Sequence, residues 1–527
     1  MVDPQGPFNT PKDFGFDPSK FPSFREYQLE SAQKVVDSTK PLILIEAPTG
    51  SGKSLLALTA HRLMPESTRG VYVVATKQLQ DQIEKDFQVP VLKGRNNYPC
   101  LVFANLFPEV NSEICKDYLG DDECNFQEDC PYLKQKRLAL SSPMCVLNYP
   151  LFLTEANYVG GFSGLDFLIL DEVDGLEDHL MSFIEVSVTR RLLQRLRLGP
   201  PKHKTKLEAW QEWTSGAKAI ALSELKRIGE PQDLEPVKLK EYGRLKRTLN
   251  KLQFLSDHLD ESWVMEQEEK GPPPHAISFK PVKISPFASD NLWRHTSKAL
   301  GMSATIMGPQ AMAIELGLHS WDVDFISLPS PFPIESRPVE YIPVANVTHK
   351  TKDSAYPKIS DAIDVILSKH PNDKVLIHAV SYDLTNFLMD YLRPKYHGLM
   401  SHKREDRAST LEKFKSYTRP VALISPSMER GVDLPGDLCR VIIVAKVPWP
   451  SLLDPQVNKR LHGFSDGSLW YARKTARSLV QMTGRATRFL GDYSESFILD
   501  EQFGNLVARN GALFPSWWRL AVRSGSL

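Results

Sequence analysis

Short apolar runs alternate with segments of helical spacing in the first third of the chain. Residues 41–46, 70–76 and 165–170 are apolar runs of strand length, and residues 53–64 repeat apolar positions at helical spacing. Strands that are apolar on both faces are typical of parallel sheets covered by helices on both sides. The pattern therefore predicts an α/β domain in this part of the chain.

The same alternation returns after Phe279. We predict strands at 374–380, 421–426, 441–447 and 496–500, and helices at 383–392 and 468–484. A length of 527 residues leaves room for roughly three or four domains. The fold class that follows is α/β, with two parallel-sheet units.

Residues 186 to about 270, between these units, have a different character. Apolar residues recur every three or four positions after Pro236, which predicts one long helix that ends before residues 271–274. Its stripe consists of Leu239, Tyr242, Leu245, Leu249, Leu252, Leu255, Leu259 and Trp263. Between Val186 and Ser256 there are sixteen Lys and Arg against seven Asp and Glu. Arg244, Lys246 and Arg247 represent this excess, which fits either a solvated helical face or a nucleic-acid contact.

The overall composition narrows the function only slightly. Lys plus Arg and Asp plus Glu are equal at 64 each, so any basic surface must be local. No apolar run reaches the roughly 18 residues needed to cross a bilayer, and the polar, Pro-rich first twenty residues do not resemble a secretory signal. We therefore expect an intracellular protein without membrane contact, in which thiols stay reduced.

The segment APTGSGKS, residues 47–54, follows a predicted strand and opens a predicted helix. Gly50 and Gly52 allow the backbone amides to turn towards phosphate oxygens at a helix N-terminus. Lys53 would reach the β- and γ-phosphates of ATP, and Ser54 would ligate Mg²⁺. The predicted ATP-binding loop consists of Ala47, Pro48, Thr49, Gly50, Ser51, Gly52, Lys53 and Ser54, with Ala47 where the stricter pattern has glycine.

Two further motifs supply the chemistry of nucleotide hydrolysis. The strand LDFLIL runs into DEVD, where Asp171 can hold Mg²⁺ and Glu172 can accept a proton from the attacking water. In QMTGRATR, residues 481–488, Arg485 and Arg488 lie three apart on one helical face and can reach a γ-phosphate across a cleft. The predicted catalytic set is Lys53, Asp171, Glu172, Gln481, Arg485 and Arg488.

Four of the six cysteines lie between these motifs. Cys100, Cys115, Cys124 and Cys130 have the spacing C-x14-C-x8-C-x5-C, without the close pairs that are usual for structural zinc. Four thiolates suit Zn²⁺ or an iron–sulfur cluster equally well, and chance proximity is a third interpretation. Cys145 and Cys439 lie in apolar strand patterns and are expected in the core.

These motifs, with further segments in the same order, resemble the superfamily 2 helicases, and more closely the XPD/DinG branch of iron–sulfur helicases. The resemblance covers nearly the whole chain. The further segments are FREYQ (24–28), KGRNNYPC (93–100), CPYLKQKRLALSSPMCVLNYPLF (130–152), LGMSAT (300–305), SPFPIESRPV (330–339) and RGVDLPGD (430–437). The resemblance implies nucleotide contacts from Arg25, Gln28 and Asp433, coupling roles for Asp174, Ser303 and Thr305, and a [4Fe–4S] cluster on the four cysteines.

The resemblance to these helicases also implies a domain plan with two RecA-like motor domains, the first of which carries two insertions. We expect the first motor domain at 1–95, 146–180 and 276–328, a cluster domain at 96–145, a helical arch at 181–275, and the second motor domain at 329–527.

The function implied is that of a monomeric, ATP- and Mg²⁺-dependent DNA helicase, moving 5′→3′ on single-stranded DNA and using the cluster domain as a wedge. Single-stranded and forked DNA, and single-strand-binding or repair proteins, are the expected partners, with the protein in the cytoplasm at the nucleoid. An RNA or RNA–DNA hybrid motor, a non-unwinding ATP switch, and a zinc-dependent binding module with residual ATPase are the alternatives.

The chain departs from the family pattern at the acidic motif. The usual DEAH is DEVD here, so Asp174 stands where the family's histidine couples hydrolysis to strand movement. The gap after the first cysteine is also shorter than in bacterial DinG proteins, which predicts a compact cluster domain.

Overall fold

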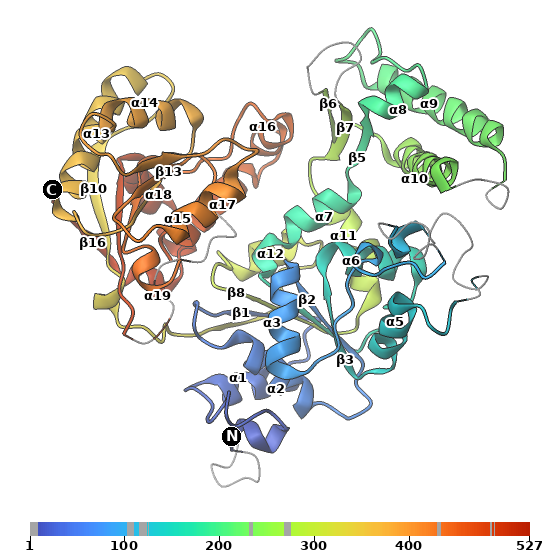
Figure 1. Cartoon of the computed structure of the whole chain (residues 1–527), viewed down its shortest axis with the longest axis horizontal. Coiled ribbons are helices and arrows are strands. Elements are labelled where there is room, and N and C mark those ends of the chain that lie inside the picture. Colours follow the sequence, from blue (N-terminus) through green and yellow to red (C-terminus); the bar gives the residue numbers. More distant parts are fainter. Residues whose placement is uncertain are drawn as a thin grey trace.

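The computed structural model describes residues 9–102, 110–114, 124, 126–230, 236–267, 276–428, 434–484, 487, 489 and 491–526. Figure 1 shows two α/β domains side by side, the first mostly in blue to cyan with yellow-green elements such as β8 and α11, the second in yellow to red, and a helical insertion in green above the first. In the described part of the chain, no helix is both long and apolar enough to cross a membrane.

The first domain is built on a six-stranded sheet with the order β3-β2-β4-β8-β1-β9, in which neighbouring strands run parallel. Its strands are β1 (Leu42–Glu46), β2 (Gly70–Val74), β3 (Met144–Asn148), β4 (Phe167–Asp171), β8 (Ala299–Ser303) and β9 (Val323–Ser327). Its helices are α1 (Gln28–Asp37), α2 (Lys53–Leu63), α3 (Lys77–Phe87), α5 (Pro131–Ser141), α6 (Tyr149–Thr154), α7 (Leu176–Ile184), α11 (Ser285–Asn291) and α12 (Pro309–Glu315). Helix α2 and strands β1, β2 and β4 lie at the predicted positions. The carboxyl ends of β1, β4 and β8 meet at one edge, where Glu46 pairs with Ser303 and Asp171 with Met302.

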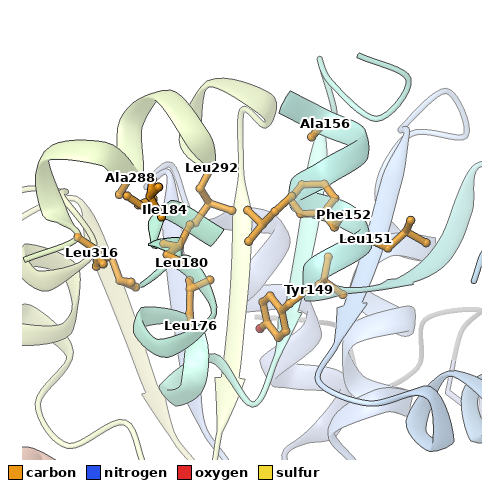
Figure 2. Packing of buried hydrophobic residues seen from close by; sticks show 14 of the residues in the cluster. Tyr149, Leu151, Phe152, Ala156, Leu176, Leu180, Ile184, Ala288, Leu292 and Leu316 are labelled. Carbon is orange, nitrogen blue, oxygen red and sulfur yellow. The ribbon is translucent and has the colours of Figure 1, made fainter. Parts of the chain in front are cut away.

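One face of this sheet is covered by α6, α7 and α11. Figure 2 shows Tyr149 and Phe152 of α6, Leu176 and Leu180 of α7, and their neighbours interlocked in this layer. Burying a leucine fully contributes about 1.5–3 kcal/mol relative to leaving it in water. Because α7 begins directly after the acidic motif, its packing fixes the backbone of that motif against the sheet.

The second domain has a seven-stranded sheet with the order β12-β13-β11-β14-β15-β10-β16, again with parallel neighbours. Its strands are β10 (Val339–Ala345), β11 (Val375–His378), β12 (Leu399–Ser401), β13 (Ala422–Ser425), β14 (Val441–Val444), β15 (Glu495–Asp500) and β16 (Val522–Ser524). Its helices are α13 (Lys352–Lys369), α14 (Tyr382–Leu392), α15 (Arg407–Ser416), α16 (Pro455–His462), α17 (Gly467–Thr483), α18 (Gln502–Asn510) and α19 (Ser516–Arg519). All four strands and both helices predicted for this unit are present.

The helical insertion consists of residues 186–230, 236–267 and 276–281. It contains an antiparallel sheet of β5 (Val186–Thr189), β7 (Ala276–Pro281) and β6 (Trp263–Gln267), together with α8 (Arg190–Arg195), α9 (Leu207–Ile228) and α10 (Pro236–His258). Helices α9 and α10 lie side by side. Leu245, Leu252 and Leu255 of α10 are fully buried.

The long helix ends earlier than its apolar spacing predicts. Helix α10 stops at His258, and Trp263 belongs to β6. Asp260 accepts hydrogen bonds from the backbone N–H and the hydroxyl of Ser262, at 2.8 and 2.6 Å, which makes a turn where the helix would continue. Trp263 then pairs with Pro281 of β7 and remains buried. Its place in the stripe was therefore a wrong prediction, because a buried strand residue mimicked the helical period.

Candidate ATPase site and domain interface

The phosphate loop lies between β1 and α2, as predicted. Gly50 and Gly52 have φ of +80° and +77°, a backbone conformation that favours glycine. A Cβ at Gly50 would collide with the ring of Phe332, and one at Gly52 would collide with the side-chain amide of Gln28. Lys53 and Ser54 are the first residues of α2. The loop therefore has the two positive-φ glycines and the adjoining helix N-terminus that a phosphate site requires.

Gln28 supports the loop from behind. Its side-chain amide donates hydrogen bonds to the carbonyls of Ser51 (2.9 Å) and Gly52 (3.2 Å), and its oxygen accepts one from the backbone N–H of Arg25 (2.7 Å). Gln28 is buried, whereas Arg25 is exposed. Gln28 thus acts on the loop's shape, while the Arg25 side chain faces solvent.

Asp171 is the last residue of β4, at the sheet edge beside the loop, and Glu172 follows it. Lys53 Nζ lies 3.5 Å from Glu172 Oε1, and Glu172 has φ of +50°. Asp171 is buried, and its Oδ1 has no hydrogen-bond partner among the residues that the structure describes. Burial raises the pKa of Asp171 to about 7, with Glu172 adding to the rise and Lys53 opposing it. A buried carboxylate oxygen without a hydrogen-bond partner is a suitable ligand for a Mg²⁺ ion.

Tyr72 contacts the phosphate loop at Ser54 and lies close enough to Asp171 to be affected by its charge. Its hydroxyl donates to Ser54 Oγ at 3.3 Å, and its pKa is raised well above the usual value by burial and by the charge of Asp171. Ser54 and Asp171 thus share Tyr72 as a neighbour, and both carry oxygen atoms of the kind that Mg²⁺ prefers. The backbone at Asp171 is held separately by Tyr149, whose hydroxyl donates to the Asp171 carbonyl at 2.8 Å.

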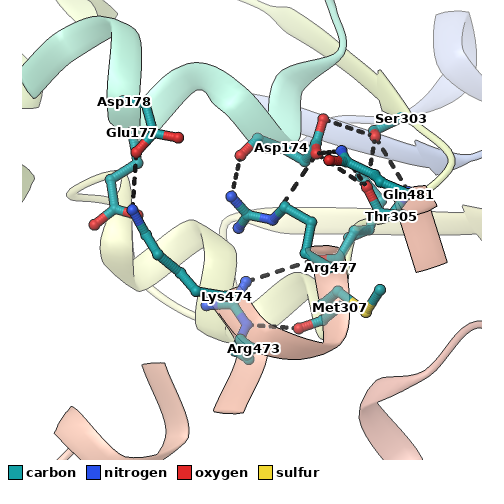
Figure 3. A network of polar contacts seen from close by, with 11 residues as sticks. Asp174, Glu177, Asp178, Ser303, Thr305, Met307, Arg473, Lys474, Arg477 and Gln481 are labelled. Atoms are coloured by element: carbon teal, nitrogen blue, oxygen red, sulfur yellow. Dashed lines mark hydrogen bonds and ion pairs between the residues drawn. The ribbon is translucent and has the colours of Figure 1, made fainter. Parts of the chain in front are cut away.

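Asp174 is the centre of a buried polar network that spans both domains (Figure 3). Its Oδ1 accepts from the Ser303 hydroxyl at 2.9 Å. Its Oδ2 accepts from the Thr305 hydroxyl at 2.9 Å and from the side-chain amide of Gln481 at 2.6 Å. Gln481 belongs to α17 of the second domain, and the other three residues belong to the first. The carboxylate in the histidine position thus joins the acidic motif, the motif after β8 and the arginine-containing motif.

Helix α17 carries a row of further contacts to the first domain (Figure 3). Trp470 donates its indole N–H to Glu177 Oε1 at 3.0 Å, and Lys474 lies 2.8 Å from Asp178 Oδ1. Arg473 donates to the Met307 carbonyl at 2.6 Å and forms an ion pair with Glu315. Arg477 donates to the Asp174 carbonyl and lies 3.8 Å from its carboxylate.

The sequence motifs did not identify the contacts of α17 that precede Gln481, namely those of residues 470, 473, 474 and 477. Their helical spacing is nevertheless visible in the sequence, because residues 470, 473, 474, 477 and 481 fall on one face of a helix. Pro48 and Thr49, with Phe332, Arg337 and Trp517, line a pocket between the domains beside this interface.

Several predicted residues lie outside the described part of the chain. These are Arg485, Arg488, Asp433 and Cys115. Their roles therefore stay predictions.

The other three predicted cluster cysteines are described. Cys100 and Cys130 are buried, and Cys124 is partly exposed. The segments that carry Cys100 and Cys130 meet through Tyr98 and Tyr132, whose ring centres are 5.6 Å apart. Among the described residues, no group of three or more His, Cys, Asp and Glu is assembled for a metal. Cys130 is the N-cap residue of α5.

The two cysteines predicted in the core and the three predicted cations of α10 are all in the described part of the chain. Cys145 and Cys439 are buried, and burial raises the pKa of each thiol to about 12, as expected of core cysteines. Arg244, Lys246 and Arg247 of α10 are exposed on either side of the buried Leu245. Their contact with nucleic acid stays a prediction.

Two family models match the chain. The DEAD/DEAH box helicase model matches residues 25–207, and the helicase C-terminal domain model matches residues 363–521. Fold and site together define a two-domain helicase, that is, an enzyme of the ATP-hydrolysing helicase class.

Relatives and solved structures give a narrower assignment. The chain is 23% identical to the ATP-dependent DNA helicase DinG of Photobacterium profundum, over 57% of this chain and 49% of that protein, so it spans about half the length of that relative. It is 22% identical to the ATP-dependent DNA helicase YoaA of Haemophilus influenzae, over 92% of each.

In fold, it is similar to an XPD helicase structure (TM-score 0.62, 17% identity, 95% of this chain and 99% of that one) and to Xpd4 of S. tokodaii (0.58, 15%, 95% and 100%). The family models, these relatives and the fold together support an XPD/DinG-like helicase of superfamily 2.

Proposed function

We propose that this protein is an ATP-dependent DNA helicase that moves 5′→3′ along single-stranded DNA. The observation that carries the proposal is the network around Asp174, which links the acidic motif of one domain to α17 of the other. A nucleotide site whose carboxylates are connected to a second domain can convert hydrolysis into domain movement. The relatives named as DNA helicases support DNA as the substrate.

Each residue of the site has a definite task in this proposal. The loop amides and Lys53 hold the phosphates of ATP, while Ser54 and Asp171 hold Mg²⁺. Glu172 accepts the proton of the attacking water, whose oxygen bonds to the γ-phosphorus as the bond to ADP breaks. When bound there, Mg²⁺ would neutralise negative charge on the phosphates. Arg485 and Arg488 are proposed to approach the γ-phosphate from the second domain.

Strand movement follows from the same interface. Closing of the cleft places Gln481 on Asp174, and reopening breaks that contact, so the two domains alternate their grip on the DNA backbone. The exposed cations of α10 place positive charge on the helical insertion, which we propose is the arch over the strand path. In this role the protein would work at the nucleoid, beside single-strand-binding or repair proteins.

We also propose that Cys100, Cys115, Cys124 and Cys130 hold a [4Fe–4S] cluster. Support comes from the buried Cys100 and Cys130 on adjoining segments and from the family's use of this position. Rigid packing of this loop-rich segment would make it a wedge beside the strand path, since a metal cluster supplies the stiffness that a small core lacks.

ATP hydrolysis, measured with and without single-stranded DNA, tests the proposed enzyme. Turnover should need Mg²⁺ and rise when DNA is added, whereas Lys53→Ala and Glu172→Gln should remove it in folded protein. Near-normal turnover in either variant would show that the site is assigned incorrectly. Stimulation by RNA but not by DNA would favour an RNA motor.

A further inference from the structure

The N-terminal end of α17 contacts the base of the helical insertion. Asp466, the N-cap residue of α17, accepts hydrogen bonds from Lys283 Nζ at 3.0 and 3.3 Å and from the Arg460 guanidinium at 2.8 and 2.7 Å. Burial raises the pKa of Asp466, but the bonds from Arg460 and Lys283 outweigh it and lower the pKa to about 2. Lys283 lies in the segment that returns from β7 to the first domain, so this ion pair connects that segment to the second domain.

Helix α16 adds two contacts to the same base. Gln456 donates its side-chain amide to the Val282 carbonyl at 2.8 Å. Lys459 donates to the carbonyls of Glu261 (2.6 Å) and Trp263 (3.3 Å) at the start of β6. A backbone hydrogen bond from Val282 to Ser262, at 2.7 Å, holds the two segments together. We call Lys283, Gln456, Lys459 and Asp466 the clasp.

The other end of α17 lies in the ATPase site. Gln481, in its last turn, donates to Asp174. A 17-residue helix is about 25 Å long, and its continuous backbone hydrogen bonds make it stiff over that length. The clasp and the ATPase site are therefore attached to opposite ends of one rigid element.

The insertion is joined to the first domain through two chain segments, next to Val186 and next to Lys283. The base of the insertion also packs on α11 of the first domain, where the ring centres of Phe254 and Trp263 lie 6.1 and 5.8 Å from that of Phe287, so we expect a small rotation about this base. A shift of α17 against Asp174 must therefore either move the base of the insertion or break the clasp. The clasp is strong for a surface contact, because Lys459 and Lys283 make charge-assisted bonds and Arg460 is almost fully buried.

We propose that α17 and the clasp form a lever that transmits nucleotide-driven movement of the second domain to the helical insertion. Lys283, Gln456 and Lys459 are positioning residues in this lever, since they act on the insertion and not on ATP. The inference rests on the proposed function, in that nucleotide must bind at the phosphate loop.

The test compares wild type with a triple variant, Lys283→Met, Gln456→Met and Lys459→Met. These changes keep most of the side-chain length, remove the polar end groups, and leave the ion pair between the buried Arg460 and Asp466 in place. Lys413→Met, at an exposed lysine of α15, is the matched control. Hydrogen exchange is measured with and without a non-hydrolysable ATP analogue and Mg²⁺, at residues 47–54 and at the strands β6 and β7.

In wild type and control, nucleotide should change exchange at both places, by about fivefold or more at β6 and β7. In the triple variant, the phosphate loop should still respond, and the change at β6 and β7 should fall below about twofold. DNA-stimulated ATPase should stay within about twofold of wild type, while base pairs separated per ATP should fall about fivefold.

Two results would overturn the lever: a wild-type insertion that ignores nucleotide while the phosphate loop responds, or a triple variant whose insertion responds as wild type does. A loss of ATPase in the triple variant would also overturn it, because the clasp would then serve domain closure. A wild-type phosphate loop that does not respond would overturn the proposed ATPase itself, and the lever with it.

Discussion

Replacement of Asp174 by asparagine keeps the size and shape of the side chain and removes its negative charge. Both Thr305 and Gln481 donate to Oδ2, so the amide oxygen of asparagine would take that position. The new NH₂ group would face the Ser303 hydroxyl, which can rotate to accept a hydrogen bond. All three bonds can therefore survive, but as bonds between neutral groups.

The magnitude follows from the contacts of Asp174 that cross between the two domains. Hydrogen bonds to a charged group contribute about 1.5–3 kcal/mol, against about 1 kcal/mol for a neutral pair. Of the three, only the bond from Gln481 crosses between the domains, and its weakening costs about 1 kcal/mol. Neutralising Asp174 also removes the charge opposite the buried Arg477 of α17, at 3.8 Å, which adds about 2 kcal/mol, so the closed interface loses about 3 kcal/mol. Since each 1.36 kcal/mol is tenfold in rate, hydrolysis that requires the closed state should slow roughly 150-fold.

Steady-state ATPase with saturating single-stranded DNA measures this effect. We expect kcat to fall by about two orders of magnitude, with KM for ATP changed by less than about threefold, because Lys53 and Ser54 are untouched. Asp178→Asn is the control, because it makes the same chemical change at the same interface. The Asp178 carboxylate is 48% exposed, so its loss should reduce the stability of the closed interface by less than about 1 kcal/mol.

A kcat for Asp174→Asn within about threefold of wild type would refute the reasoning. So would an equal loss in Asp178→Asn, because the effect would then belong to general interface charge. Gln481→Leu should give a similar loss, and the double variant should be little worse than either single variant, since both break the same contact.

Three further predictions concern other parts of the molecule. Burial raises the pKa of Glu46 to about 7, so its contribution to stability is present below about pH 4.5 and is lost as the pH rises to about 7. At pH 8, Glu46→Gln should therefore have a free energy of unfolding in urea about 3 kcal/mol higher than that of wild type. Near pH 4.5 the two proteins should differ little. Equal gains at both pH values would exclude ionisation of Glu46 as the cause. Charge reversal of Arg244, Lys246 and Arg247 should weaken single-strand binding and lower its salt slope by roughly 0.7 for each phosphate that the helix no longer neutralises, and an unchanged slope would favour a solvated face. Cys124→Ser should remove the brown colour and the roughly four irons per chain expected of anaerobically purified protein, and abolish strand separation while leaving DNA-stimulated ATPase; stoichiometric zinc in a colourless, active wild type would contradict the cluster.

Sequence reasoning succeeded where a pattern is local. The run before Ala47 and the glycines after it form a strand and a turn within a few residues, so the phosphate loop could be placed from the sequence alone. Buried strands such as β4, β11 and β14 were likewise visible as continuous apolar runs. Short or half-exposed strands, including β9, β12 and β16, gave no comparable signal, because pairing with a neighbour defines them more than their own composition does.

The sequence could not determine the role of Asp174. Asp174 and Gln481 are 307 positions apart, so no local sequence pattern links them. The replacement of the usual histidine by Asp174 suggested only that the route of coupling is altered. In the fold, a carboxylate accepts hydrogen bonds from three side chains at once, which neutral imidazole, with one acceptor nitrogen, cannot do. Trp263 shows the opposite error, in which a helical period continued by coincidence into a strand.

The central claim is that ATP hydrolysis between the two domains separates DNA strands. Strand displacement from duplexes with a 5′ or a 3′ single-stranded tail, with Glu172→Gln in parallel, tests it most directly. The account predicts ATP-dependent displacement of the 5′-tailed duplex by wild type, none by the variant, and little from the 3′-tailed duplex. Equal displacement from both tails would contradict the proposed direction, and hydrolysis without displacement from either would contradict the helicase.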